Sequence, residues 1–287
     1  MVAMFRRMVV VGVGLIGGSL ALAARRRGLV EEIIGYGRGK KNLRLAQRKG
    51  IIDRFLVHEK EIPNGADLVI LATPVQATLS LTSSFLPALE PGCLVSDVGS
   101  VKAGIVREME RLLPSHIPFI GAHPIAGSEQ WGARAALPDL FSGQRCILTP
   151  TRNTDPDALE KMACFWRRVG AKVEVMDPRL HDRIMGVVSH LPHVLAYALV
   201  NTLNRTKLDS VDLKDYCGGG FKDFTRIASS RPEIWRDICL GNGRAIGKSL
   251  GDYIKHLERL RRWIRDAEGD LLEREFAQAN EVRRQIS

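Results

Sequence analysis

The chain has 287 residues, of which 45% are hydrophobic and 26% are charged, a composition typical of a folded globular protein with one large domain or two ordinary ones. It contains no run of eighteen apolar residues, so we expect no transmembrane helix, and no association with a membrane. The net charge of +10 is dispersed in short basic clusters without a nucleic-acid-binding motif, which favours small anionic ligands over nucleic acid.

Short β-branched runs alternate with helical stretches through the first 176 residues. Continuous apolar strands of this kind predict an α/β fold with a mostly parallel sheet covered on both faces. The first run, after Met1–Arg7, leads straight into glycines and reads as a strand rather than as a signal peptide. The expected strands are 8–13, 33–36, 68–72, 94–97, 119–122, 145–149 and 172–176. The expected helices are 16–27, 43–49, 76–86, 102–112 and 157–169.

The strand pattern stops after Asp177–Pro178. The remaining residues predict helices at 180–204, 208–216, 232–255 and 257–279. We therefore expect two closely packed domains, 1–177 and 178–287.

The first strand runs into a G-x-G-x-x-G loop, Gly12-Val13-Gly14-Leu15-Ile16-Gly17. In such a loop the first glycine makes the turn, the second lets the backbone approach a pyrophosphate, and the third lets the helix pack on the strand. The following helix offers unpaired N–H groups to the phosphates. Because the motif opens a strand–helix–strand unit, it predicts dinucleotide binding.

The end of the second strand indicates which dinucleotide. A carboxylate about twenty residues after the loop would bind the ribose hydroxyls, but the expected position is Gly37, followed by Arg38. A guanidinium can pair with a 2′-phosphate, which favours NADP over NAD. The alternative is that Arg38 stacks on the adenine and tolerates either cofactor.

Three further loops follow strands at the edge where ligands of α/β sheets bind. They are Thr73-Pro74, the run from Asp97 through Ser100 to Lys102, and the run from Gly121 to Glu129. His123 lies in the third, and a histidine there can take a proton from a hydroxyl while hydride leaves the carbon. A purely structural role for His123 is the alternative.

The expected first helix of the second domain carries His190, Pro192 and His193. Proline inside a helix costs roughly 3 kcal/mol, so this kink either serves a site or relieves packing. The two histidines lack a third ligand with motif support, and no metal is expected. Further along, Arg226 could bind a carboxylate or could simply be solvated.

Together these motifs are specific. In their order and their span of nearly the whole chain they resemble the prephenate/arogenate dehydrogenase family of tyrosine biosynthesis. The stretches are Val10–Leu20, Asp97–Lys102, Gly121–Glu129, Val187–His193 and Gly218–Ala228. The resemblance implies NAD(P)-dependent oxidative decarboxylation of prephenate to 4-hydroxyphenylpyruvate. It also implies a Rossmann domain, an all-α dimerisation domain and an active site between them.

The resemblance further implies roles for individual residues. His123 resembles the base that accepts the proton of the ring hydroxyl, and Ser100 resembles a serine that holds that hydroxyl. Arg226 resembles the arginine that binds the ring carboxylate, and His193 resembles a histidine beside the substrate. Glu129 resembles an acid that gates the site. The implied lining residues are Ser128 and Trp235, and the implied cofactor contacts are Gly12, Gly14, Leu15, Ile16, Gly17, Arg38, Thr73, Pro74 and Asp97.

Several alternatives remain open from the sequence. Arogenate differs from prephenate by an amino group in place of a keto group. The spacing of the residues does not indicate which of the two substrates the protein uses. A β-hydroxyacid-type dehydrogenase would be expected to present a lysine where this chain presents His190 and His193. A non-catalytic NADP sensor would not need His123, Ser100 and Arg226 together.

Five cysteines without a C-x-x-C pair indicate reduced thiols and a cytoplasmic location. The length leaves no room for an appended regulatory domain, so any inhibition by tyrosine is expected at or near the active site.

Overall fold

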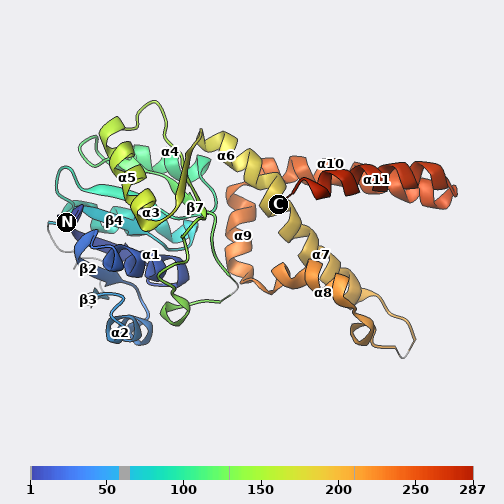
Figure 1. The fold of residues 1–287 in the computed structure, drawn as a ribbon, viewed down its shortest axis with the longest axis horizontal. Coiled ribbons are helices and arrows are strands. Elements are labelled where there is room, and N and C mark those ends of the chain that lie inside the picture. The colour runs from blue at the N-terminus through green and yellow to red at the C-terminus, as the bar shows by residue number, and fades with distance from the viewer. Residues whose placement is uncertain (1, 58–64, 129, 210, 287) are drawn as a thin grey trace.

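The computed structural model describes residues 2–57, 65–128, 130–209 and 211–286. A rounded sheet region, β1 to β9, stands beside an elongated helical region, α6 to α11 (Figure 1). The two regions meet at α6, which follows the last strand after two residues.

The sheet region is built on six parallel strands in the order β3-β2-β1-β4-β5-β6. This order is that of a Rossmann sheet, as the sequence predicts. The strands are β1 (Phe5–Val11), β2 (Val30–Tyr36), β3 (Arg54–Leu56), β4 (Leu68–Leu71), β5 (Leu94–Asp97) and β6 (Phe119–Ile120).

Alternate residues of β1 divide the core between the two faces of this sheet. Met8 and Val10 pack with α1, α2 and α5, whereas Val9 and Val11 pack with α3 and α4. Burial on both faces accounts for the continuous apolar runs of the central strands. The helices are α1 (Leu15–Arg26), α2 (Lys40–Arg48), α3 (Val75–Phe85), α4 (Ala103–Leu112) and α5 (Pro156–Val169).

The last three strands do not extend the parallel sheet. They form a small second sheet, in which β7 is antiparallel to β8 and β8 is parallel to β9. The sequence predicts strands here but not this separate sheet, nor the short β3. The strands are β7 (Ala122–Pro124), β8 (Arg145–Leu148) and β9 (Lys172–Val175).

The helical region begins with one long helical run, 178–205, that contains a π turn. Asp177 caps its start by accepting the N–H groups of Arg179 and Leu180. The π turn ends two residues before Pro192, whose missing N–H interrupts the α-helical hydrogen bonding. The parts are α6 (Pro178–Met185), the π turn Gly186–His190 and α7 (Leu191–Arg205).

By length and composition the segment 178–205 could cross a membrane, with a mean hydropathy of 1.3 in its most apolar window. A core helix of a soluble protein passes the same test, so the expectation of no transmembrane helix stays a prediction. Histidines and Pro192 interrupt the apolar residues of this segment, so it contains no run of eighteen apolar residues, but its mean hydropathy is still high enough for a membrane span. Buried polar side chains of α6 bond to the sheet region, as described below.

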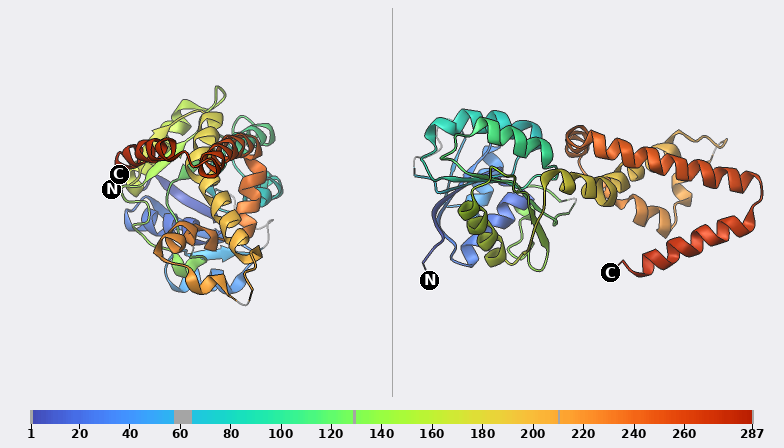
Figure 2. Two further views of the ribbon diagram at one scale, coloured as in Figure 1. Left: turned by 90° about the vertical axis from the view of Figure 1, so that its right-hand side faces the viewer. Right: turned by 90° about the horizontal axis from the view of Figure 1, so that it is seen from above.

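The remaining helices differ from expectation in their boundaries. The run 208–216 is not one helix, because a bridge between Leu208 and Val211 precedes a short 3₁₀ turn at Leu213–Tyr216. Asn242 separates two helices where the sequence predicts one. The helices are α8 (Gly219–Thr225), α9 (Pro232–Gly241), α10 (Gly243–Arg265) and α11 (Gly269–Arg284). Helices α10 and α11 project from the body as a long arm (Figure 2).

Candidate active site

The glycine loop between β1 and α1 has the backbone that a pyrophosphate requires. Gly12 has φ +102°, and a Cβ there would lie 2.5 Å from the carbonyl oxygen of Ala72. A Cβ on Gly17 would lie 2.3 Å from the carbonyl oxygen of Gly12. In contrast, nothing lies within 4 Å of a Cβ placed on Gly14. The first and third glycines thus serve packing, while the second leaves open space at the N-terminus of α1, where Leu15 and Ile16 begin the helix.

The end of β2 carries positive charge without a carboxylate. Arg38, Lys40 and Lys41 are all exposed, and a side chain at Gly37 would meet only Leu43, at 3.8 Å. Helix α2 begins at Lys40, so its positive N-terminal end adds to these charges. Asn42 connects α2 to the glycine loop by donating to the carbonyl of Val13 over 2.8 Å.

A buried ion pair lies beneath the third loop. The carboxylate of Asp97 accepts from the Lys102 ammonium, from the N–H of Gly99 at 2.8 Å and from the N–H of Ala122 at 3.2 Å. Lys102 also donates to the carbonyl of Ala122 over 2.9 Å. The pair therefore holds both backbone groups of the residue before His123. Any contact of Asp97 with a cofactor would have to come from its backbone.

His123 lies at the centre of β7, at the carboxyl edge of the sheet and facing α6. Gly121, two residues before His123, has no room for a side chain, since a Cβ would lie 2.5 Å from Oγ1 of Thr149. Burial, followed by the charges of His181, Lys102 and His190, holds the pKa of His123 well below its usual value of 6.5. His123 is therefore a neutral imidazole at physiological pH, the form that can accept a proton.

His181 and Asp182 of α6 lie directly against His123. The Nδ1 atom of His123 is 2.8 Å from Nε2 of His181, and Nδ1 of His181 is 2.8 Å from Oδ1 of Asp182. Asp182 also accepts the N–H groups of Lys102 and Ala103, at 2.8 and 2.9 Å, and so caps α4. One carboxylate thus joins the sheet region, the helical region and the histidine pair.

The π turn positions a second buried histidine. Asn242 donates to the carbonyl of Asp182 over 2.7 Å, and its Nδ2 atom lies 3.1 Å from Nδ1 of His190. Burial lowers the pKa of His190 to about 4. The backbone of Ser100 opposes this shift, which places Ser100 beside His190 at the boundary of the two regions.

Aromatic and basic side chains of α7, α9 and the turn at Arg226 lie next to His190. Trp235 packs edge-on against His190, with ring centroids 6.1 Å apart, and stacks on His193 at 3.7 Å. Burial lowers the pKa of His193, the hydrogen bond to the backbone of Ser189 opposes this, and the charge of Arg226 adds a smaller lowering. Trp235 thus contacts both His190 and His193, while His123 and Arg226 are close enough to act electrostatically on these two histidines.

The other site residues predicted from the sequence lie in the surrounding loops. Thr73 and Pro74 connect β4 to α3, where Oγ1 of Thr73 lies 3.3 Å from Oγ1 of Thr78. Ser128 is exposed and accepts the N–H of Gln130 over 3.2 Å. Glu129 lies outside the described residues.

Sequence reasoning missed His181, Asp182 and Asn242 and gave Lys102 no role. The available signal was the adjacent His-Asp pair one turn into a helix that is capped by Asp177 and begins at Pro178. Its importance depends on α6 lying against β7, which spacing along the chain does not reveal.

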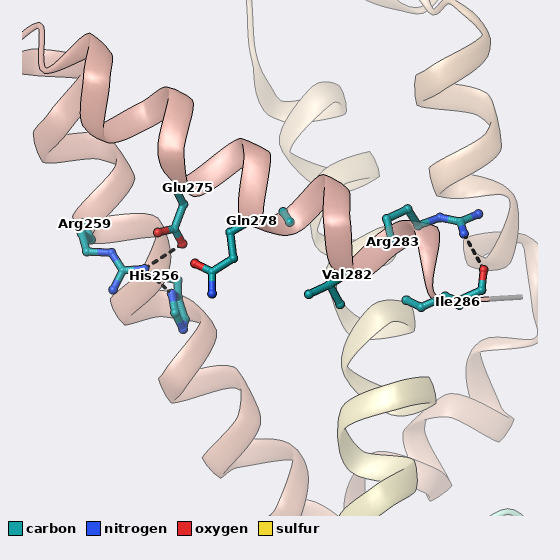
Figure 3. Close-up of a pocket in the computed structure, with 8 residues that line it drawn as sticks. His256, Arg259, Glu275, Gln278, Val282, Arg283 and Ile286 are labelled. Atoms are coloured by element: carbon teal, nitrogen blue, oxygen red, sulfur yellow. Dashed lines mark hydrogen bonds and ion pairs between the residues drawn. The ribbon is translucent and has the colours of Figure 1, made fainter.

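A recess in the helical region is lined by none of these site residues. It has a volume of about 590 Å³ and lies between α10 and α11, where Arg259 donates to Glu275 over 2.8 Å (Figure 3). The described part of the chain holds no group of three His, Cys, Asp or Glu side chains placed to bind a metal ion.

Comparison with known proteins identifies the family to which this chain belongs. Residues 20–175 match the family described as "Prephenate dehydrogenase, nucleotide-binding domain", and residues 177–278 match "Prephenate dehydrogenase, dimerization domain". Prephenate dehydrogenase of Bacillus subtilis is 36% identical over 95% of this chain and 74% of its own.

Solved structures agree closely in fold. A crystal structure of prephenate dehydrogenase from Aquifex aeolicus, in complex with hydroxyphenyl propionate and NAD+, matches with a TM-score of 0.93 and 40% identity, over 98% of each chain. Synechocystis arogenate dehydrogenase matches with a TM-score of 0.82 and 32% identity, over 98% of this chain and all of its own.

Proposed function

This chain belongs to the prephenate dehydrogenase family, and from that premise we propose that it oxidises and decarboxylates prephenate to 4-hydroxyphenylpyruvate. The observation that carries the proposal is the group of side chains at the boundary of the two regions. It comprises His123, the stacked pair of Trp235 and His193, and Arg226, whose charge acts on His193. A base at one end and a guanidinium at the other suit a ring with a hydroxyl at one carbon and a carboxylate at the opposite carbon.

Each residue has a defined task in this reaction. His123 accepts the hydroxyl proton as the hydroxyl-bearing carbon loses hydride. Arg226 holds the ring carboxylate until it departs as CO₂, and the bonding electrons left behind complete the aromatic ring. The phenolate oxygen formed in this way then regains a proton. Because aromatisation drives the reaction, the protein mainly aligns the reactants and balances charge.

The nicotinamide dinucleotide supplies the hydride acceptor when bound. The glycine loop fits its pyrophosphate, since space is open only at Gly14, and Leu15, Ile16 and Gly17 present helix N–H groups to it. Thr73, Pro74, Ser100 and the backbone of Asp97 would border the nicotinamide. Ser100 would also help to hold the substrate hydroxyl.

For the cofactor itself we favour NADP. The support is the absence of a carboxylate at Gly37 and the three exposed basic residues Arg38, Lys40 and Lys41 at the start of α2. The relative that binds NAD+ in its crystal structure shows that the family accommodates that cofactor too. No metal is needed for the proposed chemistry.

For the substrate we favour prephenate, with arogenate as the second candidate. The arogenate candidate rests on the likeness to Synechocystis arogenate dehydrogenase. Glu129 as a gating acid, and Ser128 and Trp235 as lining groups, remain proposals from the family resemblance.

Absorbance at 340 nm tests this function directly. Purified protein is incubated with NADP or NAD and with prephenate, arogenate or a β-hydroxyacid. We expect the highest kcat/KM with prephenate and NADP. Reduction with β-hydroxyacids alone would assign the protein to a different dehydrogenase class, and no reduction at all would favour a dinucleotide-binding sensor.

We also propose that residues 1–177 form the dinucleotide-binding domain and that residues 178–287 bind a second copy of the chain in a homodimer. We further propose that the protein is cytoplasmic and binds neither nucleic acid nor a membrane. On α10, Ile246 is buried within the chain, while Ile254 and Leu257 remain about half exposed and available to a second copy. The match to a dimerization domain supports a two-fold assembly. Light scattering should give about twice 31.8 kDa. A fully active monomer at micromolar concentration would contradict the dimer.

A further inference from the structure

We propose that the buried pair His181–Asp182 is a positioning relay that fixes the tautomer of His123, leaving its Nε2 atom unprotonated toward the substrate. The inference rests on the proposed function for the identity of the proton donor, but not for the tautomer itself. His181 and Asp182 are positioning residues, since they act through His123.

Hydrogen-bond chemistry assigns the protons along the relay. Asp182 is a carboxylate and can only accept, so Nδ1 of His181 must donate to its Oδ1 atom across 2.8 Å. In neutral His181 the other nitrogen, Nε2, then carries a lone pair. This Nε2 atom lies 2.8 Å from Nδ1 of His123, so Nδ1 of His123 carries the proton and donates it to the lone pair. The base of neutral His123 is therefore Nε2.

The opposite assignment requires a second proton on His181. A doubly protonated His181 would donate to Nδ1 of His123 and force the proton of His123 onto Nε2, where it could no longer accept one. His181 is fully buried, and Lys102 and His190 are also close enough to act on His123. The neutral assignment satisfies both contacts of His181 with one proton on each imidazole and adds no net charge at this fully buried position.

Asp182 makes the relay depend on how the two regions meet. The same carboxylate accepts two backbone N–H groups at the start of α4, so its position is fixed by the sheet region. Its own carbonyl is held by Asn242 at the junction of α9 and α10. A shift between the regions would therefore move His181 relative to His123, coupling the interface to the catalytic tautomer.

The relay also stabilises the positive charge that His123 acquires during the reaction. When His123 takes a proton at Nε2 it becomes a cation, and its Nδ1–H still donates to His181. His181 in turn donates to the negative Asp182, which stabilises the new charge without moving any atom far. The organisation resembles other histidine bases whose second nitrogen is fixed by a hydrogen bond.

Two substitutions at one position separate this relay from packing. His181→Phe keeps a buried ring but removes the acceptor for Nδ1 of His123. His181→Gln places an amide oxygen near the former Nε2 and so keeps that acceptor. His116→Phe, an exposed histidine outside the site, is the matched control.

The primary readout does not need substrate. Nitrogen-15 NMR of labelled histidines, with the His123 signal identified by its loss in His123→Asn, should show the Nδ1–H tautomer in the native protein, in His181→Gln and in His116→Phe. In His181→Phe the Nε2–H form should become populated. An Nε2–H tautomer in the native protein, or the same tautomer in His181→Phe as in the native protein, would overturn the relay even if the enzyme proved inactive on prephenate.

The kinetic readout follows in the active enzyme. We expect His181→Phe to lower kcat roughly 10²-fold with little change in KM, and to displace the acidic limb of the pH profile. His181→Gln should recover most of kcat. Equal losses in both variants with an unchanged pH profile would show that His181 only fills space, while failure of the native protein to turn over prephenate would contradict the proposed function alone.

Discussion

The sheet region and the helical region bury their apolar side chains to very different extents. In the sheet region Trp166, Phe5 and Phe165 are at most 1% exposed, and both faces of the parallel sheet are covered. In the helical region Val188, Leu240 and Ile264 are each more than 60% exposed. The sheet region completes its core within one chain, whereas the helical region has apolar surface that a second copy would cover.

The two regions also differ in what they contribute to the site. The sheet region supplies a backbone loop, an ion pair that fixes a strand, and one base, His123. The helical region supplies long or aromatic side chains, among them Arg226, His193 and Trp235. We therefore expect changes in the sheet region to affect chemistry and cofactor, and changes in the helical region to affect substrate affinity.

The largest effect is expected at His123. The substitution His123→Asn keeps one hydrogen bond but removes the base, so kcat should fall roughly 10²- to 10⁴-fold with a modest change in KM. Steady-state kinetics checks this, with His116→Asn as the surface control. Activity of His123→Asn within about threefold of the native enzyme would rule His123 out as the base.

The helical counterpart is Arg226→Ala. Removing the guanidinium should weaken prephenate binding by about 2–4 kcal/mol, or roughly 30- to 700-fold, because a charge-assisted contact with the ring carboxylate is lost. Calorimetry should show unchanged NADP affinity. Arg231→Ala, which removes a surface partner of Glu233, is the matched control. Equal loss of substrate and cofactor affinity would indicate a folding defect instead.

Cofactor choice tests the sheet region alone. A charge-assisted pair between Arg38 and a 2′-phosphate contributes about 1.5–3 kcal/mol, which predicts a roughly 10- to 150-fold preference for NADP that shrinks with added salt. The double change Gly37→Asp with Arg38→Ala should reverse the preference, as measured by kcat/KM for each cofactor. If Arg38→Ala leaves the ratio of kcat/KM for NADP to that for NAD unchanged, Arg38 does not bind the 2′-phosphate.

The smallest effect concerns acid stability at the boundary of the regions. Because burial holds the pKa of His190 at about 4, the folded state keeps this histidine neutral while the unfolded chain binds a proton below about pH 6.5. The stability contributed by neutral His190 is complete above pH 6.5 and is lost as the pH falls toward 4. Between pH 7 and 5 this loss should be roughly 1–2 kcal/mol. Urea unfolding of His190→Asn should show a correspondingly weaker pH dependence, and an unchanged slope would contradict the assignment.

The sequence predicted the sheet region better than the helical region, for a physical reason. Buried strands and the glycine loop are local patterns, so β1, β4 and β5 were found within a few residues. Helix ends such as the break at Asn242 depend on contacts with distant residues. The same holds for the site, because His123 follows a strand in a recognisable motif, whereas His181 gains its role only by packing against β7.

The central claim is that His123 and the helical side chains act on one molecule of prephenate to couple hydride loss with loss of CO₂. Single-turnover experiments with prephenate labelled in the ring carboxylate measure both products together. The account predicts one labelled CO₂ released for each reduced dinucleotide formed, with both slowed equally in His123→Asn. Reduced dinucleotide without labelled CO₂, or equal rates in the native enzyme and the variant, would contradict it.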